Sequence, residues 1–213
     1  MTYDDKDGLC LLYPSLVRAA EIFSDRADQT VESNQIILKT DYSLDQTADL
    51  PGGQFLGGIS VPVTVKGIDD TIKLYGPDPN KIENDELILT SAVMFDMLIL
   101  DHIGHIYCNG NNITMGEQIR TVAEVYLYGA KDRVIPDTIG SISVLGGRYT
   151  RIAGYARNTG KVEDVTGKRA SITVDKNAVV DTIIAGTASA GVENADVEIN
   201  VKGRFPWASA QSM

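Results

Sequence analysis

The most apolar stretch of the 213-residue chain, residues 87–108, constrains the fold more than any other feature of the sequence. Its sequence is LILTSAVMFDMLILDHIGHIYC. Over residues 87–100 apolar side chains occupy both odd and even positions, so periodicity predicts either a buried strand pair or a short buried helix. Both histidines, His102 and His105, and one of the two cysteines, Cys108, lie in this stretch. It is therefore either the central seam of a β fold or a site built into that seam, and we expect the seam.

One helix is predicted near the N-terminus. Apolar residues recur there at positions i, i+3, i+4 and i+7, the spacing of one face of a helix: Leu16, Ala19, Ala20 and Phe23. Pro14 and Ser15 suit the first turn. We expect this helix to lie on a sheet or on a neighbouring subunit.

Two further segments carry strand and turn signals. Apolar residues, including Val61 and Val63, alternate across GGISVPVTVKG, and Pro62 lacks the N–H that an inner strand would donate. Residues 59–65 are therefore predicted to form an edge strand or a bulge. Asn109-Gly110 predicts the tight turn of a β-hairpin, because both residues tolerate positive φ.

The composition changes beyond residues 129–140, toward Gly, Ala, Thr and Val. Short strand-like runs recur there, at 142–145, 149–155, 170–174, 179–184 and 197–201. Their spacing predicts a small β sandwich or barrel. We therefore predict a mainly β protein, with an N-terminal helix and a β-rich region over residues 1–130 and a C-terminal small β sandwich or barrel over residues 141–213. A single domain is the alternative.

Charge and composition narrow the function classes. The formal charge of −10 and the absence of a Lys/Arg run predict no direct contact with nucleic acid. The opening MTYDDKDG is acidic and lacks the pattern of a secretory leader, and Asp96 and Asp101 interrupt the longest apolar run, so no membrane span is expected. Cys10 and Cys108 fit free thiols or one bridge. We expect a soluble protein made inside the cell, although export without a leader remains an alternative.

The sharpest candidate for chemistry is Asp101-His102-x-x-His105-x-x-Cys108, because these residue types are ligands of zinc and related metals. On a strand, however, His102 and Cys108 share one face while Asp101 and His105 share the other. On a helix Asp101, His105 and Cys108 align, but Gly104 and the following Asn-Gly disfavour a helix. We therefore assign no metal site, and keep His102, His105 and Cys108 as the candidate ligands.

Catalytic motifs give no support for an enzyme. No G-x-S-x-G occurs, and the pairs Gly52-Gly53, Gly57-Gly58 and Gly146-Gly147 precede neither a Lys-Ser/Thr pair nor a clear helix. The adjacent carboxylates Asp4-Asp5 and Asp69-Asp70 are typical of a tail and a turn. We expect no cofactor and no catalytic activity.

One resemblance comes from the C-terminal third. It reads YTRIAGYARNTGKVEDVTGKRASI and then DTIIAGTASAGVENADVEINV within residues 149–201. This pattern of small-residue strands, an Ala/Gly-rich turn and a closing Val/Ile strand resembles tailed-phage virion proteins, particularly capsid decoration (cement) proteins. The resemblance implies a non-enzymatic subunit, made in the host cytoplasm, that assembles in a virion with copies of itself and with other virion proteins.

Three hypotheses therefore stand. The first is a homo-oligomeric virion subunit acting through symmetric contacts, with Val61 and Val63 at an edge and Phe205 and Trp207 near the terminus as candidate partner contacts, since aromatic residues are enriched at binding hot spots. Phe205 and Trp207 could equally cover the chain's own core. The second is a metal- or thiol-dependent enzyme centred on residues 101–108. The third is a ligand-binding β module with stacking tyrosines, Tyr126, Tyr128 and Tyr149.

Overall fold

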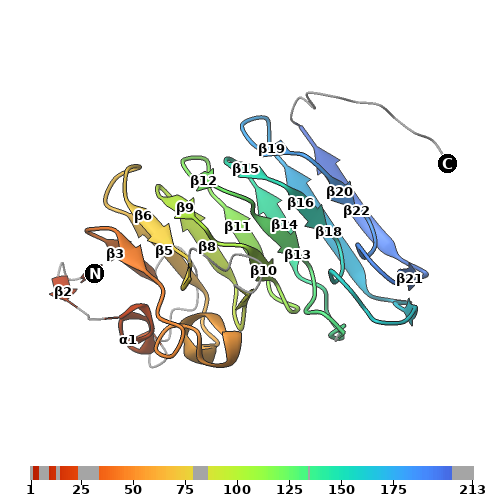
Figure 1. Cartoon of the computed structure of the whole chain (residues 1–213), viewed down its shortest axis with the longest axis horizontal. Coiled ribbons are helices and arrows are strands. Elements are labelled where there is room, and N and C mark those ends of the chain that lie inside the picture. Colours follow the sequence, from red (N-terminus) through yellow and green to blue (C-terminus); the bar gives the residue numbers. More distant parts are fainter. Residues whose placement is uncertain are drawn as a thin grey trace.

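Each strand from residue 35 onward pairs in parallel with a strand one turn of chain away, so the backbone winds into a stack of coils, a β-solenoid (Figure 1). The structure is a computed structural model that describes residues 2–4, 10–12, 15–23, 34–78, 86–133 and 135–202. The residues of successive coils stand in register, as one column of sheet A shows: Val63, Val93, Ile113, Ile142, Ile172 and Ile199.

Three main sheets form the walls of the stack. Sheet A contains β3 (Gln35–Leu38), β5 (Val63–Gly67), β8 (Val93–Asp96), β11 (Ile113–Met115), β14 (Ser141–Val144), β18 (Arg169–Val174) and β22 (Asp196–Val201). Sheet B contains β4 (Tyr42–Ser43), β6 (Lys73–Tyr75), β9 (Ile99–Asp101) and β12 (Arg120–Val122). Sheet C contains β7 (Glu86–Ile88), β10 (His105–Tyr107), β13 (Tyr126–Tyr128), β16 (Arg151–Ala153) and β20 (Ile183–Ile184).

Shorter elements complete the stack. Two-stranded pairs form between β15 (Arg148–Tyr149) and β19 (Val179–Val180), and between β17 (Glu163–Asp164) and β21 (Val192–Glu193). At the other end, β1 (Thr2–Asp4) and β2 (Cys10–Leu12) add to sheet A in antiparallel orientation. Two 3-10 turns, η1 (Pro51–Gly53) and η2 (Phe55–Gly58), lie between β4 and β5.

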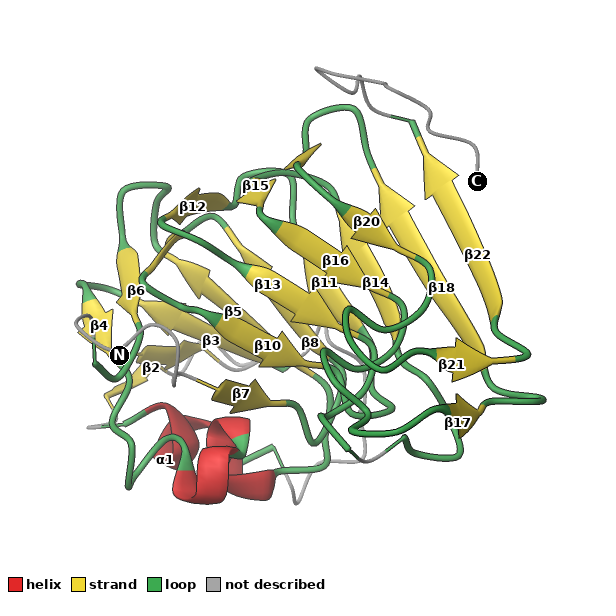
Figure 2. Ribbon diagram, turned by 45° about the vertical axis from the view of Figure 1, so that its right-hand side comes forward, coloured by secondary structure: helices red, strands yellow, loops and turns green. Residues whose placement is uncertain are grey.

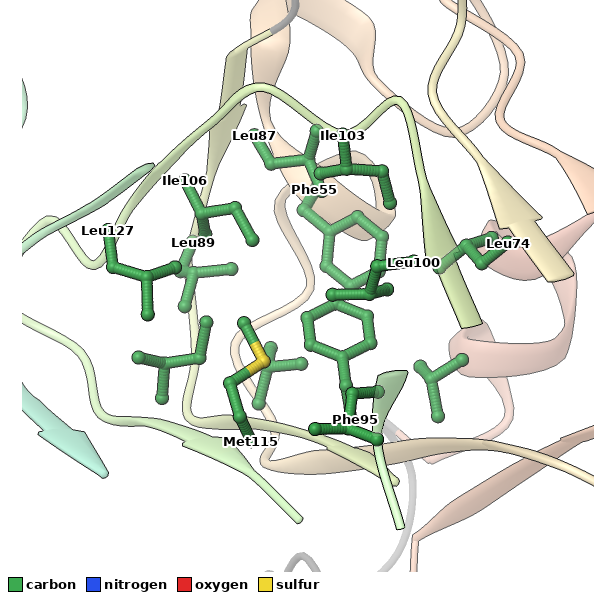
Figure 3. Packing of buried hydrophobic residues seen from close by; sticks show 14 of the residues in the cluster. Phe55, Leu74, Leu87, Leu89, Phe95, Leu100, Ile103, Ile106, Met115 and Leu127 are labelled. Carbon is green, nitrogen blue, oxygen red and sulfur yellow. The ribbon is translucent and has the colours of Figure 1, made fainter. Parts of the chain in front are cut away.

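The core lies inside the stack and is built by alternation along each strand. Every second side chain of a strand faces inward and is buried. Inside the stack, apolar side chains from different sheets and neighbouring coils pack against one another (Figure 3). Phe55 and Phe95, for example, pack with ring centroids 5.5 Å apart. Burial of each such large side chain contributes on the order of 2 kcal/mol.

The predicted helix is present as α1 (Leu16–Glu21). Leu16, Ala19 and Ala20 of α1 are buried in the core, as is Phe23 in the turn that follows it. Ser15 is the N-cap, and its hydroxyl accepts the Arg18 N–H. A second acceptor is Asp49, whose buried carboxylate accepts the N–H of Leu16 at 3.0 Å and of Val17 at 3.3 Å. Figure 2 shows α1 beside the N-terminal coils, below β3 and β7. None of the described helices is long and apolar enough to cross a membrane.

Residues 87–108 are the seam that we expected, although they form neither a strand pair nor a helix. They supply most of β7 and all of β8, β9 and β10, so this one stretch passes through all three sheets. Both parities are apolar because the chain turns a corner after each short strand, which changes the side that faces the core.

Two local predictions are corrected by the topology. Residues 63–67 form β5, which pairs with β3 on one side and β8 on the other, so it is an inner strand and not an edge. Pro62 is tolerated because it lies just before the ladder begins. Asn109 and Gly110 do adopt positive φ, 50° and 87°, but their turn joins β10 of sheet C to β11 of sheet A and makes no hairpin.

The prediction of a separate C-terminal sandwich or barrel was also wrong. Strands β14, β16, β18, β20 and β22 continue sheets A and C, so residues 141–201 belong to the same solenoid as the strands before them. The change in composition at residues 129–140 marks instead the first of three longer loops that join sheet C to sheet A; the other two span residues 154–168 and 185–195.

Glycines permit the close stacking of these loops. A Cβ atom on Gly140 would lie 1.5 Å from the backbone oxygen of Asn111 in the preceding coil. One on Gly129 would lie 2.0 Å from the backbone oxygen of Gly154 in the next. At Gly140 and Gly129, therefore, the absence of a side chain permits coil-to-coil contact.

Candidate functional site

The outer face of sheet C carries the main cluster of polar and aromatic side chains. Glu86, His105, Tyr126 and Arg151 stand in register on β7, β10, β13 and β16, and form a row along the stack. The His105 and Tyr126 rings have centroids 4.8 Å apart, and the Arg151 guanidinium carbon lies 5.9 Å from the centre of the Tyr126 ring. These distances are those of stacking and cation–π contacts.

A second, buried row runs beside the first. Tyr107 and Tyr128, two residues further along β10 and β13, stack with centroids 5.2 Å apart, between Ile88 and Ala153. Both tyrosines are fully buried although they point away from the solenoid core. Burial raises the pKa of Tyr128 to about 12, and raises that of Tyr107 as well.

An ion pair from two loops closes over these rows. Arg157 Nε donates to Asp132 Oδ2 at 3.0 Å, and Arg157 Nη1 lies 3.2 Å from Nε2 of His105. Because the guanidinium has only donors, Nε2 of His105 accepts, and the ring proton is on Nδ1. Burial, and then the charge of Arg157, lowers the pKa of His105 to about 4. His105 is therefore a neutral imidazole at pH 7.

The exposed part of this cluster has the groups of a small polar binding surface. Arg151 makes no ion pair within the part of the chain that the structure describes, and its Nε is buried without a hydrogen-bond partner there. The half-exposed Tyr126 hydroxyl donates to Glu124 at 2.6 Å. An arginine beside an aromatic edge and two carboxylates, Glu86 and Glu124, can bind hydroxyl- or carboxylate-bearing ligands.

The predicted stacking tyrosines are mostly inaccessible. Tyr149 is fully buried, and its hydroxyl donates to the backbone oxygen of Gly146. Tyr128 is buried in the second row, so Tyr126 alone of the three is partly exposed. Its ring already contacts His105 and Arg151, from the strands on either side of β13.

The candidate metal ligands are divided among three environments. His102 lies at the corner after β9, where its Nδ1 contacts Asp101, and the same buried carboxylate accepts Lys73 Nζ at 3.0 Å. His105 is on the outer face of sheet C. Cys108 is fully buried in the solenoid core, which raises the pKa of its thiol. Within the described ranges, no three His, Cys, Asp or Glu side chains form a group that could hold a metal ion.

The candidate partner contacts are also separated. Val61 and Val63 are 5% and 0% exposed and pack in the core, so neither side chain is accessible to a partner. Phe205 and Trp207 lie outside the described residues.

Exposed large apolar residues among those described are Ile68, Val122, Val162, Ile199 and Val201, and the last two lie together on the terminal strand of sheet A. Ile199 and Val201 of β22 stand in register with the buried Ile172 and Val174 of β18, yet they are 40% and 36% exposed. Sheet C ends one strand earlier, at β20, in the region that the structure describes. Among the described residues, therefore, no strand of sheet C faces the inward side of β22.

Sequence reasoning missed Arg151, Arg157 and Asp132. Arg157 lies 52 residues from His105 and 25 residues from Asp132 along the chain, and Arg151 lies on a different strand from Tyr126. Single charged residues at such separations form no local motif. Registered positions are about 20 to 30 residues apart along the chain. A search of the sequence for a repeat of that length is what could have identified these residues as neighbours.

Comparison with protein-family models, with curated proteins and with solved structures finds no match to this chain.

Proposed function

We propose that the chain is a non-enzymatic structural subunit that acts by assembling with other protein subunits. The observation that carries this proposal is the end of sheet A, where Ile199 and Val201 expose an inward-facing apolar strip on a strand with one strand neighbour among the described residues. Strand edges with unpaired N–H and C=O groups are templates for pairing with another chain.

The resemblance of residues 149–201 to tailed-phage decoration proteins supplies the setting of the proposal. In that setting the subunit is made in the host cytoplasm and becomes part of the virion, with copies of itself and other virion proteins as partners. A stack of hydrogen-bonded coils that presents β22 at one end suits repeated contacts of defined geometry.

The states of His105 and Cys108 weigh against the alternative of a thiol or metal centre. His105 is neutral and its Nε2 is occupied by Arg157, so it is not available as a base at that nitrogen. The Cys108 thiol is buried with a raised pKa, whereas a nucleophilic cysteine needs an accessible thiolate.

The molar mass in solution tests the proposal. Light scattering from about 1 µM to about 1 mM should show a mass that rises with concentration, since one strand edge is smaller than a standard interface. Ile199→Lys should hold the protein at the monomer mass. Ile68→Lys, at another exposed apolar residue, on the β5–β6 turn, is the matched control and should associate normally. A monomer at every concentration would contradict the proposal.

A second candidate function is ligand binding on the outer face of sheet C, because Arg151 there has no carboxylate partner among the described residues. Calorimetric titration with neutral and uronate oligosaccharides, for wild type and Arg151→Ala, tests it. If the wild type binds the acidic sugar and the variant does not, ligand binding at this face is supported. Equal heats of binding for the two proteins would contradict this second candidate function.

A further inference from the structure

The edge of β22 has a sequence that is complementary to itself. The strand alternates apolar residues that face the interior, Val197, Ile199 and Val201, with polar residues that face outward, Asp196, Glu198, Asn200 and then Lys202. An acidic residue therefore stands at one end and a basic residue at the other, equidistant from Ile199.

The direction of the backbone groups on β22 follows from its bonds to β18. The Lys202 N–H donates to the Val174 oxygen at 2.8 Å. In a parallel ladder alternate residues bond to the same neighbour, so the even-numbered residues of β22 are engaged with β18. The N–H and C=O groups of Val197, Ile199 and Val201 therefore point to the edge of β22 that has no strand neighbour among the described residues.

We infer that β22 pairs antiparallel with β22 of a second copy about a two-fold axis at Ile199, which joins two A sheets into one. This inference rests on the proposed function and names its partner and register. In this pairing, Ile199 lies opposite Ile199 of the second copy, and Val197 lies opposite Val201. The backbone N–H and C=O groups of all three residues, which point to the edge, then form hydrogen bonds between the copies. The apolar strips of both copies then continue as one inner surface.

The charges select this register over its neighbours. Asp196 lies opposite Lys202 of the second copy, twice by symmetry, and Glu198 lies opposite Asn200. Shifting the centre to Glu198 would place two carboxylates directly opposite each other, which is destabilising. Shifting it to Asn200 leaves Val197 without a partner among the described residues. A register centred between two residues would pair inward-facing with outward-facing side chains.

Asp196 and Lys202 are both exposed, and in the single chain neither side chain has an ion-pair partner among the described residues. By contrast, Glu198 is already paired with Arg169 at 2.7 Å and bonded to Asn200. The two-fold contact therefore supplies partners to the two charges of β22 that lack one, and leaves the paired carboxylate in place.

Zero-length carbodiimide cross-linking tests the register on the wild-type protein. Asp196 and Lys202 of one chain are about 20 Å apart along the strand, too far for such a link, so an Asp196–Lys202 amide can form only between chains. In a mixture of unlabelled and ¹⁵N-labelled protein, we expect this cross-linked peptide pair with one light and one heavy partner.

Charge reversal at the two ends of β22 provides a second test of the register. Asp196→Lys and Lys202→Asp should each raise the dimer dissociation constant about tenfold, because each places like charges opposite at two positions. The double variant Asp196→Lys/Lys202→Asp should return to within about threefold of wild type. These exposed positions leave the core intact, and an unchanged thermal transition confirms folding.

The outcomes separate the inference from the proposed function. A dimer with the mixed-isotope link and with charge rescue supports both. Association without the link, or with no effect of either reversal, overturns the two-fold register and leaves assembly standing. Growth into open-ended species overturns it too, because a β22 edge joined to the β2 edge of the next copy does not close. A strict monomer shows that the charges of β22 protect the edge, and overturns both.

Discussion

Nη1 of Arg157 lies 3.2 Å from Nε2 of His105, a contact between side chains 52 residues apart that joins the loop after β16 to the outer face of sheet C. The contact fixes the tautomer of His105 and, with burial, lowers its pKa to about 4. Since the ordinary value is about 6.5, the folded state resists a proton that the unfolded state takes up.

This pKa predicts how stability depends on pH. The free energy of unfolding should be highest above pH 6.5 and should fall as the pH drops from 6.5 toward 4, by about 2 kcal/mol between pH 7 and pH 5. His105→Gln keeps an acceptor for Arg157 and should remove most of that slope. His102→Gln, at the other histidine, should leave the His105 contribution in place. Urea unfolding at both pH values measures it, and an unchanged slope in His105→Gln would contradict the account.

The carboxylate of Asp49 should matter more than the N-cap hydroxyl of Ser15. Asp49 accepts from two backbone N–H groups of α1, from the Asp45 N–H at 3.0 Å and from the Tyr42 hydroxyl at 2.5 Å, while fully buried. Asp49→Asn should cost about 3 kcal/mol, because it replaces a charged acceptor of several bonds. Ser15→Ala should cost about 1 kcal/mol. Equal losses in denaturant unfolding would show that Asp49 does not cap the helix.

The stacking of coils predicts that substitution by alanine destabilises the protein much more at one glycine than at another. Gly140→Ala should destabilise by more than about 3 kcal/mol, since its Cβ would overlap the Asn111 oxygen of the coil before. Gly167→Ala meets no atom within 4 Å, and has only a positive φ of 76° to oppose it, so a loss of about 1 kcal/mol is expected. Thermal unfolding of the two variants measures this difference, and comparable transitions would argue against tight coil contact.

The thiol of Cys108 should be unreactive in the folded protein. It is fully buried and its pKa is raised, so little thiolate forms at neutral pH. In a Cys10→Ser variant, a thiol reagent should label no cysteine at pH 7 until denaturant is added. Rapid labelling of the native variant would reopen the possibility of a thiol centre at residues 101–108.

The sequence predicted the elements that depend on local pattern. The helix at residue 16 and the turn at Asn109-Gly110 follow from side-chain spacing and from tolerance of positive φ, and both are present. It did not predict how those elements combine. Strands such as β5, β8 and β9, of five, four and three residues, are too short for alternation to identify the sheet that each joins. Pro62 predicts an edge only if it lies within a strand, and β5 begins just after it.

The candidate sites were harder to predict for the same reason. The position of His105 beside Tyr126 and Arg151 depends on the number of residues in each coil. That number varies: registered positions are 30 residues apart from Val63 to Val93 but 20 apart from Val93 to Ile113. Such an irregular period hides the repeat. Alternation alone cannot distinguish Ile199 and Val201 from core residues, because it does not show that, among the described residues, no strand of sheet C faces β22.

Amide hydrogen exchange of β22 as a function of protein concentration tests the central claim most directly. If the open edge of β22 is the assembly contact, the N–H groups of Val197, Ile199 and Val201 should exchange more slowly as concentration rises from about 1 µM to about 1 mM, and Ile199→Lys should abolish this change. Exchange of these three amides that is the same at every concentration, in a protein whose mass nevertheless increases, would contradict the account.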